Sequence, residues 1–162
     1  MGSIDSLLKK LKESKEFKKY KEKNPSAYLC VGFFVLDFQS GHDSYQFDYC
    51  FNNQIETFFI EPETNEIKSK PAEPQEGKMP GKISENVKID LKKIREIAEN
   101  YAEKNDLKLT KIIAILQIHE GRQIWNLTCI SGFKMLRLYI DSESGEILKT
   151  DTASMFDFIK KT

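Results

Sequence analysis

The chain has 162 residues, of which 40% are hydrophobic, and its 25 basic residues balance 25 acidic ones. This length fits one medium domain or two small ones, and the zero net charge excludes a general attraction to nucleic acid. No apolar run is long enough to span a bilayer, and the N-terminus lacks the pattern of a secretory signal. We therefore expect a cytoplasmic protein without a nucleic-acid partner.

The first expected element is a basic N-terminal helix. Its apolar residues have helical spacing: Ile4, Leu7, Leu8 and Leu11. That stripe stops at Ser14, and Phe17 and Tyr20 fall nearly opposite to it, so either the helix breaks near Ser14 or both of its sides find contacts. The lysines between positions 9 and 23 favour a solvated face, with docking on an anionic membrane or partner as the alternative.

Residues 1–6 also fit the N-myristoylation pattern, with Gly2 as the acceptor, although Met1-Gly2-Ser3 can equally be a cloning remnant. Membrane contact is expected only through this lipid or through the basic helix.

Four strands are expected after Asn24-Pro25, where the helical region ends. They cover residues 28–38, 45–51, 55–60 and 66–69, with turn residues between them. The first strand is so rich in aromatic and β-branched residues that we expect it to be buried on both faces for much of its length. The order is one helix followed by a four-stranded meander.

A second helix and four more strands are expected beyond a Pro/Gly linker at residues 71–84. Asp90 is a good N-cap for a helix carrying the strongest apolar stripe of the chain, from Leu91 to Ala102. The strands are expected at residues 107–118, around Trp125, at 135–140 and at 147–148. The tail at residues 151–162 has apolar residues at helical spacing and is expected to fold as a short helix, if it folds.

The two units match each other at an offset of 80 positions, and the turns, the strand alternation and a large aromatic residue stay in register. Tyr45 falls on Trp125, and Gly41 falls on Gly121. We therefore expect an α+β fold with two tandem repeats of a helix and a four-stranded antiparallel meander, at residues 1–70 and 85–150. Each unit alone is small, so the two are expected to pack together through sheet faces or by edge pairing.

The second unit resembles a PepSY domain. The residues that carry the resemblance are the helix start at Ile89-Asp90, Trp125 in the middle strand and the closing segment Tyr139–Leu148 with Asp141 and Gly145. The first unit has Glu61 and Asn65 at the corresponding positions, and Asn is the next-best residue for a left-handed turn. The resemblance implies a non-enzymatic module. Residues 117–121, Gln-Ile-His-Glu-Gly, also resemble the inhibitory loop of a cystatin.

The chain shows no pattern typical of a catalytic, metal or cofactor site. Cys30, Cys50 and Cys129 lack metal-ligand spacing and are expected to be reduced thiols, with a cross-strand Cys30–Cys50 disulfide as the alternative. His42 and His119 lie near turns, and nothing in their spacing predicts that they meet.

The aromatic sheet of the first unit is the expected ligand or partner surface, because its own helix supplies few apolar residues to cover it. The candidate residues are Phe34, Phe38, Tyr45, Phe47, Tyr49, Phe51 and Trp125. The sequence thus favours a non-catalytic binding or regulatory module for a peptide, a protein or a small apolar ligand. The alternatives are an assembly subunit, such as a homodimer formed through sheet edges, a cystatin-like protease inhibitor and an enzyme of an unrecognised kind.

Overall fold

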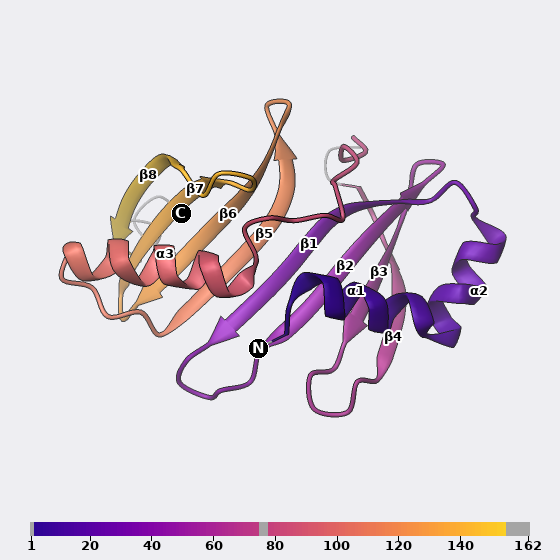
Figure 1. The fold of residues 1–162 in the computed structure, drawn as a ribbon, viewed down its shortest axis with the longest axis horizontal. Helices are drawn as coiled ribbons and strands as arrows, with labels where there is room; N and C mark the ends of the chain where they lie inside the picture. The colour runs from indigo at the N-terminus through magenta and orange to yellow at the C-terminus, as the bar shows by residue number, and fades with distance from the viewer. Residues whose placement is uncertain (1, 75–77, 155–162) are drawn as a thin grey trace.

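The computed structural model describes residues 2–74 and 78–154, in which eight strands form one antiparallel sheet with the order β4-β3-β2-β1-β5-β6-β7-β8. Helices α1 and α3 lie over the same face of this sheet (Figure 1). The fold is therefore α+β, as expected. The elements are α1 (Ile4–Glu13), α2 (Lys15–Lys23), β1 (Tyr28–Asp37), β2 (Ser44–Phe51), β3 (Gln54–Ile60), β4 (Ile67–Ala72), α3 (Leu91–Lys104), β5 (Lys111–His119), β6 (Arg122–Ser131), β7 (Lys134–Asp141) and β8 (Ile147–Ser154).

The N-terminal helical region breaks at Ser14, which confirms one of the two expected arrangements. The Ser14 hydroxyl donates to the carbonyl of Leu11 at 2.6 Å and accepts the N–H of Phe17 at 3.2 Å. This one side chain ends α1 and caps α2, because it satisfies backbone groups that a helix terminus leaves without partners. The change of direction lets Phe17 reach the core that α1 also covers.

The start of α3 is tied to the start of α1 by a single carboxylate. Asp90 Oδ1 accepts the N–H of Leu91 at 2.7 Å and the N–H of Ile4 at 3.1 Å. Asp90 is the N-cap of α3, as the sequence predicts. It therefore links two helices that are 86 positions apart in the sequence.

The turns that close β3–β4 and β7–β8 have the same backbone hydrogen bonds. In each, the fifth residue donates to the carbonyl of the first: Asn65 to Glu61 at 2.8 Å, and Gly145 to Asp141 at 2.9 Å. Asn65 has a φ of 58° and Gly145 a φ of 80°, which is the left-handed region that these two residue types tolerate best. Asp141 also accepts two N–H groups of its own turn, as expected.

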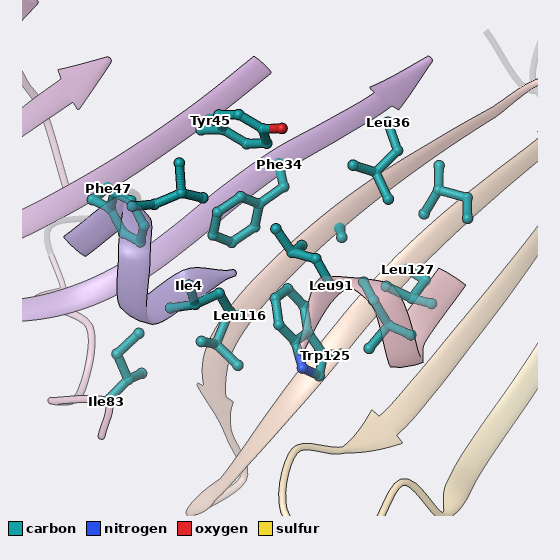
Figure 2. Close-up of a cluster of buried hydrophobic side chains, with 14 of the residues drawn as sticks. Ile4, Phe34, Leu36, Tyr45, Phe47, Ile83, Leu91, Leu116, Trp125 and Leu127 are labelled. Carbon is teal, nitrogen blue, oxygen red and sulfur yellow. The ribbon is translucent and has the colours of Figure 1, made fainter. Parts of the chain in front are cut away.

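The two halves of the chain meet where β1 pairs with β5, so edge pairing joins them and one core runs across the joint. Phe34 on β1 packs on Trp125 of β6 with ring centroids 5.6 Å apart (Figure 2). The Trp125 indole donates to the carbonyl of Ile89 at 2.7 Å, next to the start of α3. Trp125 and Phe34 have no exposed surface. The core is therefore shared between the halves.

The structure corrects several boundaries expected from the sequence. β4 continues to Ala72 into the expected linker, and β8 continues to Ser154, so the first four residues of the tail are strand. The remainder of the tail, and its expected helix, lies outside the described residues. The expectation that β1 is buried on both faces is wrong, because its residues alternate between buried and half-buried positions.

The first hairpin of each half differs in register. Tyr45 on β2 faces Phe34 on β1. An unbroken offset of 80 positions would therefore place Trp125 opposite Ala114, but Trp125 faces Leu116. The strands β1 and β2 are joined by a longer loop than β5 and β6. This shift by two residues keeps Tyr45 and Trp125 on the helix-covered face, since side chains alternate with a period of two.

Trp125→Phe is expected to lower the free energy of unfolding by about 2 kcal/mol, because it removes the hydrogen bond to Ile89 and leaves part of the ring volume empty. Urea denaturation followed by circular dichroism measures the change. The matched control is Leu148→Ala, which alters a side chain that is 37% exposed. A loss no larger than that of the control would contradict the central place of Trp125 in the core.

Candidate functional site

The structure distributes the aromatic residues that the sequence singles out between the core and two surface cavities. Phe34, Phe47 and Trp125 lie in the shared core, and Tyr45 is also buried there. Phe38 is half-buried under the guanidinium of Arg95, 4.1 Å from the ring centroid. Tyr49, which is also buried in the core, and Phe51 each line a surface cavity, and these two cavities are different.

The cavity at Tyr49 is the candidate site, and we name it the lysine-rimmed pocket. It has a volume of about 620 Å³ and lies between α1, α2, the start of β1, β2 and the segment 82–85 that leads towards α3. Its lining residues are Lys12, Phe17, Lys18, Lys21, Glu22, Ala27, Tyr28, Leu29, Tyr49, Lys82, Ile83 and Glu85. Such a volume is typical of small-molecule sites, which span about 300–1,000 Å³.

The floor of the lysine-rimmed pocket is apolar and firmly held. Phe17 packs edge-on against Tyr49, with ring centroids 5.0 Å apart. The N–H of Ile83 donates to the carbonyl of Leu29 at 3.0 Å, so the segment before α3 runs beside the start of β1. Ile83, Leu29 and Phe17 are each at least 95% buried. The pocket is therefore lined by residues already fixed in the core.

The Tyr49 hydroxyl is a buried polar group without a hydrogen-bond partner among the described residues. Buried hydroxyls are usually paired, since leaving one unpaired costs about 1–3 kcal/mol. Burial raises the pKa of Tyr49 well above its ordinary value, and the negative charge of Glu85 raises the pKa further. The hydroxyl therefore stays protonated and available as a donor at neutral pH.

The rim of the pocket is positively charged. Four lysines and two glutamates line the cavity, which leaves an excess of two positive charges. Lys12 pairs with Glu85 at 2.7 Å, and both side chains are nearly half exposed. Lys21 donates to the carbonyl of Ala27 at 2.6 Å and so fixes the end of α2 to the start of β1. The pocket combines an apolar floor with cationic groups at its opening.

Another cavity, distinct from the one at Phe51, lies on the opposite face of the sheet and has a volume of about 440 Å³. Phe33, Ile115 and Met79 contribute its apolar surface. The pKa of Asp48, one of its lining residues, is raised, because burial outweighs the hydrogen bonds from Thr57 and Gln46. Each of these groups has a partner, which distinguishes this cavity from the lysine-rimmed pocket.

The expectation of reduced thiols is wrong for Cys30 and Cys50, which form a disulfide with their Cα atoms 6.2 Å apart. The two cysteines lie on neighbouring strands where the β1–β2 register shifts between Leu29 and Val31. This irregularity places both sulfurs on the face opposite the helices. The cross-strand disulfide that the sequence offered as the alternative is therefore confirmed. Cys129 is a free, buried thiol, and burial raises its pKa to about 12.

The two histidines lie at opposite ends of the antiparallel β1–β5 pair. His42 is in the loop after β1 and contacts Glu63 at 3.1 Å, whereas His119 ends β5 and packs on the Tyr139 ring. Within residues 2–74 and 78–154, no group of three or more His, Cys, Asp or Glu side chains could hold a metal ion. None of the described helices is long and apolar enough to cross a membrane.

Sequence reasoning missed most of the lysine-rimmed pocket. Lys12, Lys18 and Lys21 stand out in the sequence only as a basic helix, and Lys82 only as part of the linker. The sequence feature that could have indicated the pocket is the break at Ser14, because it separates α2, with the pocket residues Lys18 and Lys21, from α1. Nothing in the composition of the linker predicts that Ile83 lines this pocket.

Comparisons with known proteins support the fold. No family model matches the chain, and no curated protein matches it. Among solved structures, the chain is similar to the crystal structure of a "putative lipoprotein" from Clostridium difficile 630, with a TM-score of 0.62 and 14% sequence identity. The match covers 85% of this chain and 90% of that chain. At this identity the likeness shows the fold alone.

Tyr49→Phe is expected to raise the free energy of unfolding by about 1 kcal/mol, because it removes a buried hydroxyl that has no partner. Urea denaturation measures the change. Tyr45→Phe is the matched control on the same strand, since the Tyr45 hydroxyl contacts Asp43 at 3.5 Å and its removal is expected to bring no gain. Equal destabilisation by both substitutions would show that Tyr49 has a partner in solution.

Thiol titration of the purified protein is expected to find one thiol per unfolded chain before reduction and three after it, because Cys129 is free and the other two cysteines are bonded. In the folded protein the Cys129 thiol should react slowly, since it is buried and protonated. Three reactive thiols in the unfolded, unreduced protein would contradict the disulfide.

Proposed function

We propose that the protein is a non-catalytic binding module that holds a small, largely apolar ligand in the lysine-rimmed pocket. The observation that carries this proposal is the buried, unpartnered hydroxyl of Tyr49, a residue that lines that pocket. A ligand with a hydrogen-bond acceptor would give this donor the partner that the protein lacks. The apolar floor around it, with Phe17, Leu29 and Ile83, would supply hydrophobic contact area.

The small-ligand proposal is favoured over strand addition by a peptide, because the start of β1 is already occupied. The N–H of Ile83 donates to Leu29, and the Tyr28 hydroxyl donates to the carbonyl of Pro80 at 3.1 Å. A peptide that extends a sheet needs free backbone groups at the edge. The cystatin-like role of residues 117–121, which span the end of β5 and the β5–β6 turn, stays a prediction.

Assembly through the β4 edge of the sheet is less favoured than ligand binding. The edge strand β4 carries Lys68 and Lys70 and includes Pro71, and such residues disfavour pairing with a second strand. A homodimer therefore stays a secondary proposal, as does contact of the basic helices with a membrane.

We also propose that the two halves are tandem PepSY-like repeats. Each half has a helical region, of two helices in the first half and one in the second, followed by four strands. The two closing turns share their hydrogen bonds and left-handed positions. The shift of two residues in the first hairpin keeps the same faces buried, so it is compatible with divergence of two copies. A PepSY-like origin agrees with a binding role without catalysis.

The disulfide favours an oxidising compartment for this protein, since such bonds are rare in proteins of a reducing cytosol. It therefore argues against the cytoplasmic location expected from the sequence.

The proposal is tested with N-phenyl-1-naphthylamine, a neutral probe that fluoresces in apolar sites. We expect it to bind the protein saturably, and Ala27→Phe is expected to weaken binding at least about tenfold, because the new ring fills the pocket beside Leu29. Ala72→Phe is the matched control, as Ala72 lines two other cavities but not this one. Equal binding to all three proteins would overturn the proposed site, as would an absence of binding.

A further inference from the structure

The charge and the unpartnered hydroxyl of the lysine-rimmed pocket lie in the same part of it. Lys12 and Glu85 bridge α1 and the segment before α3 at 2.7 Å. Tyr49 lines the same cavity as Lys12 and Glu85. The pocket therefore holds a cation, a donor without a partner and an acidic side chain that pairs with the cation.

We infer that the pocket takes a straight-chain alkyl carboxylate whose head group replaces Glu85 at Lys12 and accepts a hydrogen bond from Tyr49. This inference rests on the proposed function and names its ligand class. The alkyl chain lies along the apolar floor formed by Phe17, Leu29 and Ile83.

The head group is assigned as a carboxylate by charge and by hydrogen-bonding capacity. Lys12 and the Tyr49 hydroxyl are both donors, and an anionic oxygen accepts from both in charge-assisted or ordinary hydrogen bonds. A cationic head group would meet an excess of two positive charges at the rim. A neutral alcohol can accept from Tyr49 but leaves Lys12 with its present partner.

Replacement of Glu85 is feasible because its side chain is 44% exposed and returns to water when it leaves Lys12. An ion pair exposed to this degree contributes little to stability, so exchange of its acidic partner costs little. The ligand gains in addition the hydrogen bond to Tyr49, which Glu85 does not form. In the absence of a ligand, the Glu85 carboxylate thus occupies the position beside Lys12 that the head group would take.

The tail is assigned as an alkyl chain by the size and the apolar lining of the pocket. The cavity of about 620 Å³ opens between two helices and a strand end, which leaves room for a small molecule but not for a folded segment. The apolar side chains that line it belong to the packed core and are fixed in place. A flexible alkyl chain can follow such a floor.

The test compares decanoate with decan-1-ol, which have the same chain length and differ in the head group, by isothermal titration calorimetry. On the unmodified protein we expect decanoate to bind about tenfold more tightly. Tyr49→Phe should weaken decanoate binding about fivefold and Lys12→Gln should abolish most of the preference. Equal affinity for the two compounds would overturn the inference.

Glu85→Gln is the decisive variant. It removes the competing carboxylate, so decanoate should bind about threefold to tenfold more tightly while decan-1-ol binding stays unchanged. Glu120→Gln is the matched control, because it makes the same charge change at a side chain that is 86% exposed and outside the pocket. Weaker or unchanged decanoate binding in Glu85→Gln would overturn the exchange of partners.

The outcomes separate this inference from the proposed function. If N-phenyl-1-naphthylamine binds in the pocket and decanoate binds no better than decan-1-ol, the head-group assignment fails and the binding module stands. If neither the dye nor either alkyl compound binds, both fail.

Discussion

The pairing of β1 with β5 is the interaction on which the rest of the structure depends. It joins six residue pairs from Gly32–Leu116 to Asp37–Lys111 and turns two four-stranded halves into one sheet. The joint brings Phe34 against Trp125, so that a single core passes under both α1 and α3 (Figure 2). Each half alone has too few residues to bury a large core, and the shared sheet removes that limit.

The same joint shapes the lysine-rimmed pocket. β5 pairs with β1 from Gly32 onwards, which leaves the earlier part of β1 beside the segment that carries Ile83. That segment passes next to α1 and α2 before it enters α3, and it brings Glu85 to Lys12. A cavity forms where α2 turns away at Ser14, and one of its lining residues is Tyr49, whose buried hydroxyl has no hydrogen-bond partner among the described residues. Because buried hydroxyls are usually paired, this one is the basis of the proposed ligand site.

Local features of the sequence predicted the local features of the structure. The break at Ser14, the N-cap at Asp90 and the left-handed turns at Asn65 and Gly145 each depend on one side chain and its nearest backbone groups. Features that depend on distant residues could not be predicted in the same way. Edge pairing and face packing of the two halves were equally compatible with the pattern, because strand alternation defines a buried face but not its neighbour.

The candidate site also depends on distant residues, so the sequence predicted only part of it. The sequence indicated an aromatic surface on the first sheet, yet alternation alone cannot tell whether a ring such as Phe47 faces a helix or a groove. The Cys30–Cys50 bond arises where the register shifts, and the pocket needs residues from both sides of the linker. Of the aromatic residues indicated by the sequence, Tyr49 is the one that lines the lysine-rimmed pocket.

Native-state hydrogen exchange measured by nuclear magnetic resonance tests most directly whether the β1–β5 joint makes the two halves one unit. We predict that the paired amides of β1 and β5 exchange only through global unfolding, with the same free energy as the central amides of β2 and β6. A distinctly lower free energy for β1 and β2 than for β5 and β6 would contradict the account, because the two halves would then open independently.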